Sequence, residues 1–166
     1  DPGYFGARGA FARAGIRLSP IPVDKEGVSI TAIRKNRDSA RLLYVTPSHQ
    51  FPLGVTMSLA RRLELLDWAR KTEAWIIEDD YDGEFRYAGR PIPSLQGLNG
   101  GERVIYTGTF SKVLFPSLRI GYLVVPHDLV EAFIKGRVMT DMHSSTIPQA
   151  ALADFITETT KGTVMA

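Results

Sequence analysis

The chain has 166 residues, 44% of them hydrophobic, which is enough for about one domain with a core, and its net charge of +2 favours neither a nucleic-acid nor a membrane partner. It contains no cysteine, which excludes disulfides and thiolate metal ligands, and the spacing of its three histidines fits no zinc site. No apolar run reaches the roughly 20 residues that span a bilayer, and no signal peptide opens the chain, which predicts a cytoplasmic protein.

The first 40 residues predict short elements separated by turn-forming residues. Residues 1–15 favour a strand end followed by a helix that stops at Gly15. Residues 16–23 alternate partly between apolar and polar side chains, but their two prolines restrict them to a short or edge strand. Residues 24–36 predict a turn and a short helix, with Ile30 and Ile33 facing inward.

Two buried strands flank the longest predicted helix. Residues 41–46 and 74–78 are largely continuous apolar runs, which are typical of buried strands. Ser58 is placed to cap a helix that runs to about Thr72. One face of this helix is expected to meet the core and the other to be a solvated surface. The inward set is Leu59, Leu63, Leu66 and Ala69 or Arg70, and the solvated set is Arg61, Arg62, Glu64 and Asp67.

The second half of the chain predicts two more strands and a helix. Residues 104–106 and 120–125 are apolar and rich in β-branched residues, which favours buried strands. Residues 128–140 show helical spacing of apolar side chains. The residues of this helix expected to face inward are Leu129, Phe133 and Ile134.

Three further segments complete the pattern. Residues 144–158 predict a helix that breaks near Pro148. Residues 85–87 favour a small strand, and residues 88–102, rich in glycine and proline, a loop. Strands that are continuous apolar runs therefore alternate with helices. This alternation predicts an α/β fold, with a mostly parallel sheet covered by helices on both faces.

Polar residues follow three of the predicted strands. His49 follows one strand, Asp79 ends the next, and Lys112 follows a third. Functional loops of parallel sheets lie at the carboxyl ends of the strands, so these three segments are expected to meet at one edge. This convergence carries more weight than any single residue.

A lysine segment lies between the last two predicted strands. Thr109, Ser111 and Arg119 surround Lys112 in sequence. Hydroxyls and a guanidinium are the donors that a phosphate needs, and here they accompany a reactive amine. A lysine without such neighbours is more often a surface residue.

The lysine segment resembles that of fold-type-I enzymes dependent on pyridoxal phosphate, the aminotransferase class I/II family. The resemblance rests on T-x-S-K, on an arginine seven residues after the lysine, and on L-R-I-G-Y. It implies pyridoxal 5'-phosphate as the cofactor, held as a Schiff base on Lys112. It also implies that Thr109, Ser111 and Arg119 bind the cofactor phosphate.

Asp79 is the candidate partner of the cofactor's pyridine nitrogen. A carboxylate at the end of a buried strand is costly unless a cation pairs with it, and the protonated ring nitrogen is such a cation. Tyr81 would donate to the phenolic oxygen. An amino compound would displace Lys112, whose freed amine would then take the Cα proton. The neighbouring acids Asp80, Asp82 and Glu84 are expected only to solvate a loop.

Three further blocks resemble one branch of the family, the aminotransferase-like domain of MocR-type regulators in the GntR class. They are D-P-G-Y-x-x-A-R, T-P-S-H-Q-F-P-x-G and E-D-D-Y-D-x-E-F-R-Y. The resemblance implies an amino-compound substrate or effector, and a homodimer in the complete protein. It implies DNA binding only through an N-terminal winged helix-turn-helix domain. Residues 1–166 are then a partial large domain that lacks both this domain and the C-terminal small domain.

One position departs from the family pattern. Most aminotransferases carry an asparagine that bonds the phenolic oxygen just before P-x-G, and here Phe51 stands there. His49 or Gln50 is a candidate substitute in cofactor binding. A purely structural loop histidine fits the sequence equally well.

Three functions stay open: the regulator domain, a genuine aminotransferase acting on an amino acid, and an inert truncated fragment. A P-loop is excluded because G-x-x-x-x-G-K-[ST] is absent, and a serine hydrolase because G-x-S-x-G is absent. The resemblance also implies a further strand, from sequence ahead of Asp1, between residues 16–23 and 41–46. Without it, we expect the chain to bind cofactor weakly or not at all, and to self-associate or depend on a neighbouring chain.

Overall fold

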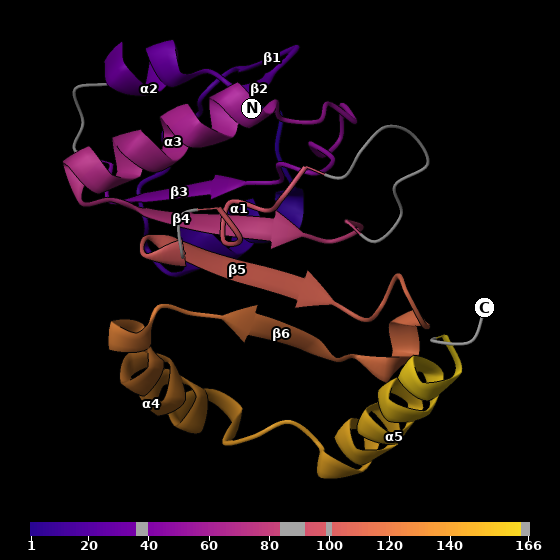
Figure 1. The fold of residues 1–166 in the computed structure, drawn as a ribbon. Coiled ribbons are helices and arrows are strands. Elements are labelled where there is room, and N and C mark those ends of the chain that lie inside the picture. Colours follow the sequence, from indigo (N-terminus) through magenta and orange to yellow (C-terminus); the bar gives the residue numbers. More distant parts are fainter. Residues whose placement is uncertain (36–39, 84–91, 99–100, 164–166) are drawn as a thin grey trace.

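A computed structural model describes residues 1–35, 40–83, 92–98 and 101–163, with side chains up to residue 159. Its centre is a four-stranded sheet in the order β3-β4-β5-β6, in which β3 to β5 are parallel and β6 is antiparallel (Figure 1). The strands are β3 (Leu42–Val45), β4 (Trp75–Asp80), β5 (Val104–Thr109) and β6 (Gly121–Val124). The predicted α/β fold with a mostly parallel sheet is confirmed.

Helices and short elements join these strands. The helices are α1 (Phe5–Arg13), α2 (Ile30–Lys35), α3 (Leu59–Thr72), α4 (Val130–Asp141) and α5 (Thr146–Thr163), with the 3-10 turns η2 (Pro116–Leu118) and η3 (His127–Leu129). A separate two-stranded ribbon pairs β1 (Val23–Asp24) with β2 (Gly27–Val28). Ile30 and Ile33 of α2 are buried as predicted. The strand predicted over residues 16–23 is wrong except at Val23, because Pro20 and Pro22 lack the N–H that a ladder needs.

Helix α3 begins and ends as the sequence predicts. The Ser58 hydroxyl accepts a hydrogen bond from the Arg61 backbone N–H at 3.2 Å, and Glu73 ends the helix in the left-handed conformation. Its buried face, however, is rotated from the predicted one. The buried residues are Arg62, Leu65, Leu66, Trp68 and Ala69. Leu59 and Leu63 are exposed, so the inward assignment of both is wrong.

Arg62 is fully buried, which corrects its predicted place on a solvated face. Its guanidinium lies 3.7 Å from the carboxylate of Glu78 in β4, which is also fully buried. Backbone groups satisfy the remaining polar atoms of the pair. Arg62 donates to the carbonyls of Met57, Pro47 and Pro93, and Glu78 accepts from the amides of Leu95 and Gln96. The pair therefore fixes the loop after β3 and the segment 93–96 against the sheet.

The chain beyond β5 is mostly exposed. All four residues of β6 are exposed, so the predicted burial of residues 120–125 is wrong. Helix α4 has no buried residue, and the exposure of its Phe133 and Ile134 corrects their inward placement. Leu129 lies in η3 and is only partly buried. Helix α5 continues through Pro148, because this proline lies in the first turn, where its missing N–H has no helical partner to lose. β6 forms an edge of the sheet, and α4 and α5 lie beyond it (Figure 1).

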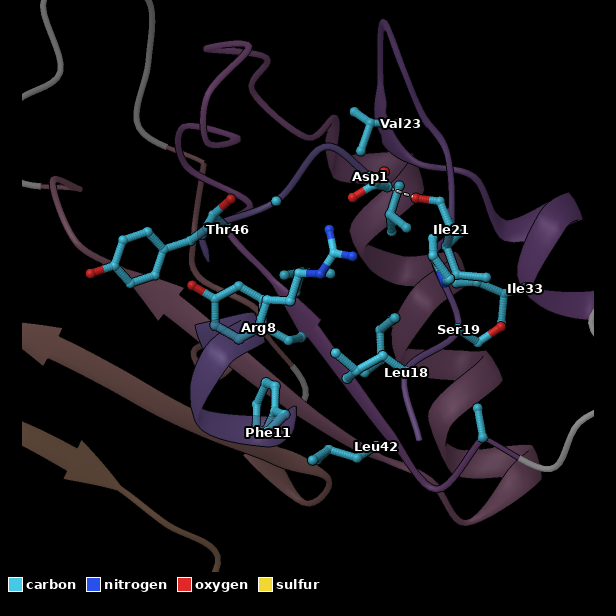
Figure 2. Close-up of a pocket in the computed structure, with 18 of the residues that line it drawn as sticks. Asp1, Arg8, Phe11, Leu18, Ser19, Ile21, Val23, Ile33, Leu42 and Thr46 are labelled. Carbon is cyan, nitrogen blue, oxygen red and sulfur yellow. Dashed lines mark hydrogen bonds between the residues drawn. The ribbon is translucent and has the colours of Figure 1, made fainter. Parts of the chain in front are cut away.

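The opposite edge of the sheet borders an apolar groove. Figure 2 shows this cavity of about 500 Å³ between α1, the segment 16–23 and β3. Phe11 and Leu42 line one side of it, and Leu18 and Ile21 line the other. Among the described residues, β3 has a strand neighbour only on its β4 side. The groove thus lies where the resemblance implies a further strand.

Candidate functional site

The carboxyl ends of β3, β4 and β5 meet at one edge of the sheet. The parallel register places Asp79 of β4 opposite Thr107 of β5, two residues before Thr109. The loop that follows β3 reaches the same edge, because its His49 contacts Asp82 after β4. The three segments that the sequence predicts to converge therefore do so.

Asp79 is half-buried and takes a hydrogen bond from a neighbouring strand. The Tyr44 hydroxyl of β3 donates to Oδ2 of Asp79, and Oδ1 has no hydrogen-bond partner among the described residues. Burial raises the pKa of Asp79, the Tyr44 hydrogen bond opposes that rise, and the charges of Asp80 and Asp82 add to it. A cation beside Oδ1 would therefore favour the charged form of Asp79.

Tyr81 lies directly after β4 and packs against the loop after β3. Its ring centroid lies 6.4 Å from that of Phe51 with an interplanar angle of 84°, and Phe51 also meets Tyr4 edge to face at 5.6 Å. Burial, followed by the charges of Asp82 and Asp79, raises the pKa of Tyr81, which keeps its hydroxyl a donor. Phe51 thus supports Tyr81 by packing and supplies no polar group of its own.

The two residues beside Phe51 use their polar groups differently. The buried amide of Gln50 donates to the carbonyls of Pro2 and Phe51 at 2.7 and 2.6 Å, so it secures the backbone. His49 Nδ1 lies 3.0 Å from Asp82 Oδ2, and both side chains are partly exposed. Gln50 and His49 are the two candidate substitutes for the family asparagine. The polar groups of Gln50 bind the backbone, whereas the His49 side chain is directed toward the acidic residues that follow β4.

The side chains of Asp80 and Asp82 do more than solvate a loop. Burial raises the pKa of Asp82, while the His49 ring and then the Lys112 charge act to lower it. The Tyr106 hydroxyl of β5 donates to Asp80 Oδ2 at 2.8 Å. The second carboxylate oxygens of Asp80 and Asp82 are buried and have no hydrogen-bond partner within the described part of the chain. The solvated-loop interpretation is wrong for these two residues, and Glu84 and residues 85–91 lie outside the described residues.

The lysine turn joins β5 to β6. Thr109 Oγ1 accepts from the Ser111 backbone N–H at 3.1 Å, and the Phe110 amide donates to the Ile120 carbonyl at 3.0 Å. This return of the chain brings Arg119, in the left-handed conformation at φ 53°, back beside the end of β5. Lys112 and Arg119 are both exposed. Two hydroxyls, an amine and a guanidinium thus lie on one short turn.

Sequence reasoning missed the two tyrosines that hold the carboxylates. Tyr44 and Tyr106 both lie inside strands that were assigned only to the core. The available signal is a tyrosine one to three residues before the end of a strand whose neighbour ends in acids. Within the described residues, no helix is long and apolar enough to cross a membrane, and no cluster of histidines and acids could hold a metal ion.

The fold and site define a class of protein. The model of the family described as aminotransferase class I and II matches residues 1–163. The chain therefore belongs to this family, which confirms the resemblance seen in the lysine segment.

The relatives give the branch of the family. The chain is 50% identical to the probable rhizopine catabolism regulatory protein MocR of Rhizobium meliloti, over 95% of this chain and 32% of that protein. It is 51% identical to the uncharacterized HTH-type transcriptional regulator YdeL of Bacillus subtilis, over 94% of this chain and 33% of that one. The chain thus spans about a third of the length of these relatives, and it is similar to the MocR branch that the three sequence blocks predict.

Solved structures agree with the fold. The α-aminoadipate aminotransferase LysN of Thermus thermophilus, complexed with N-(5'-phosphopyridoxyl)-L-leucine, has a TM-score of 0.90 at 31% identity, over 97% of this chain and 43% of that one. The kynurenine aminotransferase of Pyrococcus horikoshii has a TM-score of 0.84 at 33% identity, over 89% of this chain and 38% of that one. The fold of the chain is therefore that of a fold-type-I aminotransferase.

Proposed function

We propose that the chain is the pyridoxal-phosphate-binding, aminotransferase-like domain of a MocR-type transcription regulator of the GntR class. The observation that carries the proposal is the meeting of Asp79, Tyr81 and the lysine turn at the carboxyl edge of one sheet. The identity of 50% and 51% to two regulators supports the regulator branch over the enzyme branch.

The residues fit the cofactor group by group. Pyridoxal phosphate needs an anion at its ring nitrogen, a donor at its phenolic oxygen, an amine for its aldehyde and a cradle for its phosphate. Asp79 offers an oxygen without a partner among the described residues, and Tyr81 a hydroxyl with a raised pKa. Lys112 offers the amine. The phosphate ligands in this proposal are Thr109, Ser111 and Arg119.

Each protein group has a definite task in this proposal. When bound, the cofactor supplies an electron sink for a carbanion at Cα of an amino compound. Asp79 keeps the ring nitrogen protonated, and Tyr81 orients the ring through the phenolic oxygen. Lys112 would hold the aldehyde through its amine, and the same amine, when free, would hold the Cα proton. His49, directed by Asp82, completes the binding set beside Tyr81.

The partners follow from the regulator branch. The small-molecule partner is an amino compound that acts as effector, and DNA is bound through a separate helix-turn-helix domain. The protein acts in the cytoplasm as a homodimer. Residues 1–166 are part of a larger domain in this proposal. The groove beside β3 is consistent with a further strand of that domain at this edge of the sheet.

A second function has its own support. LysN and the kynurenine aminotransferase are enzymes, and the chain is 31% and 33% identical to them. A genuine aminotransferase would use the same residues with turnover instead of sensing. An inert fragment is the third alternative, in which the lysine turn binds no cofactor.

The test uses the protein at its full natural length. We expect pyridoxal phosphate to give a yellow species that borohydride fixes on Lys112, as located by peptide mapping, and that Lys112→Ala removes. Label on another lysine would overturn the assignment, and no label at all would overturn cofactor binding. Label in the full-length protein but none in the 166-residue chain would favour the inert-fragment alternative. Turnover of amino acid with keto acid, without operator binding in a gel-shift assay, would favour the enzyme over the regulator.

A further inference from the structure

Two adjacent carboxylates of β4 are each held by a tyrosine from a neighbouring strand. Tyr44 of β3 donates to Asp79, and Tyr106 of β5 donates to Asp80. Successive side chains of a strand point to opposite faces of the sheet, so the two pairs lie on opposite faces. The register agrees, because Tyr44 pairs with Ile77 whereas Tyr106 pairs with Glu78.

The position of Tyr44 is fixed by more than its hydrogen bond. Its backbone lies in the ladder opposite Ile77, and its ring meets Phe11 of α1 edge to face at 6.0 Å and 70°. The ring is partly buried by these contacts. The hydroxyl is therefore held toward the end of β4, where it reaches Oδ2 of Asp79. A hydroxyl held in this way loses little conformational freedom when it makes the bond.

We propose that Tyr44 is a positioning residue for Asp79: it holds Oδ2, leaves Oδ1 for the ring nitrogen of the cofactor, and stabilises the charged carboxylate. The assignment of the cofactor ring nitrogen to Oδ1 rests on the proposed function. The positioning of Asp79 by the Tyr44 hydrogen bond does not depend on it. A hydrogen bond to the ionised form of a carboxyl favours that form, and here it opposes burial and the charges of Asp80 and Asp82.

The test compares Tyr44→Phe with Tyr106→Phe in the protein at its full natural length. Both variants keep the aromatic ring and remove one hydroxyl, but only Tyr44→Phe removes a donor from Asp79. In the cofactor-free protein, carbon-13 NMR of labelled aspartate, with the Asp79 signal assigned by Asp79→Asn, follows the titration of Asp79. We expect Tyr44→Phe to raise the pKa of Asp79 and Tyr106→Phe to leave it near the wild-type value.

A second readout is the affinity for pyridoxal phosphate. In metal sites, loss of a group that orients a ligating side chain costs about 10- to 100-fold in affinity, and by analogy Tyr44→Phe should weaken binding roughly tenfold, and Tyr106→Phe less. In the Asp79→Asn background, Tyr44→Phe should have no further effect on affinity, because the carboxylate it positions is gone. Circular dichroism of both Phe variants controls for misfolding.

The outcomes separate the two proposals. An unchanged Asp79 titration in a folded Tyr44→Phe variant would overturn the hold of Tyr44 on Asp79. So would a full additional loss of affinity in the Asp79→Asn background. Failure of the wild-type protein to bind pyridoxal phosphate would instead contradict the proposed function, and the Asp79 titration in the cofactor-free protein would still decide the role of Tyr44.

Discussion

The part of the chain from Gly27 to Thr109 and the part after it differ sharply in burial. In the first part, α2, α3 and β3 to β5 enclose nearly all of the core residues. In the second part, Leu152 is the one buried side chain among the described residues 111–159. Yet both parts are rich in apolar residues. The exposed apolar side chains of the second part include Phe115, Leu123, Phe133, Ile134, Val138, Met139, Ile147, Phe155 and Ile156.

The difference teaches where the candidate site is already formed and where it depends on neighbours. Asp79 and Tyr81, which would hold the ring, are anchored to buried strands. Lys112 and Arg119, which would hold the aldehyde and phosphate, lie in the exposed part. An apolar surface of this extent usually marks a contact with another domain or chain. We therefore expect the ring side of the site to be preset and the phosphate side to need that contact.

The strongest test of the buried part is Arg62→Met. It leaves Glu78 without its charged partner in the core, and such a loss costs about 3–5 kcal/mol of the free energy of unfolding. Urea unfolding of the full-length protein measures it. Arg70→Met is the matched control in the same helix, because Arg70 is exposed and should have no measurable effect. Equal effects of the two substitutions would contradict the buried pair.

Asp79→Asn tests the ring side of the candidate site, which lies in the buried part. The loss of a hydrogen bond to a charged group costs about 1.5–3 kcal/mol, so the affinity for pyridoxal phosphate should fall by roughly 10- to 150-fold. Fluorescence titration of the full-length protein measures this change. Unchanged affinity would make Asp79 a loop carboxylate without a role at the ring nitrogen.

The same substitution should have the opposite effect on the stability of the cofactor-free protein. The pKa of Asp79 is raised on folding, so the folded state binds the proton more tightly than the unfolded state. Stability from this group is therefore lost as the pH rises from the ordinary carboxyl pKa through the raised one. Asp79→Asn should stabilise the cofactor-free protein at neutral pH and make no such difference below the ordinary pKa. Urea midpoints at pH 3.5 and 7 compare the two.

Ser58→Ala tests how far local signals stabilise the buried part. The Ser58 hydroxyl caps α3, and replacing such a cap by alanine costs about 1 kcal/mol. Urea unfolding measures the loss, and Ser58→Thr, which keeps the hydroxyl, should recover most of it. A loss as large as that of Arg62→Met would indicate that Ser58 does more than cap the helix.

The smallest effect is expected in the exposed part. In the 166-residue chain, Ile134→Ala should change the free energy of unfolding by less than about 0.5 kcal/mol, because Ile134 is 58% exposed. The same chain should self-associate through its exposed apolar surface, and Ile134→Asp should reduce this association in sedimentation velocity. A monodisperse monomer that binds pyridoxal phosphate at micromolar concentration would show that the exposed part needs no covering.

The sequence alone determined the elements that depend on neighbouring residues. The alternation of apolar runs and helical spacing predicted β3, β4 and α3 within two residues of their observed ends and the start of β5, and Ser58 marked the start of α3. The prediction missed the last three residues of β5, Thr107 to Thr109. The lysine segment also identified the family, because T-x-S-K and the following arginine lie within a few residues of one another. Such signals involve residues that are close together in the chain, so they can be recognised without the tertiary structure.

Only the tertiary structure decided which residues meet across long separations. Arg62 and Glu78, like Tyr44 and Asp79, are partners because parallel strands and a packed helix bring them together. Hydropathy also cannot tell an apolar face that is covered from one that is not, so it predicted burial for β6 and α4. Burial depends on whether a second surface lies against the first, and a single strand or helix carries no record of that surface.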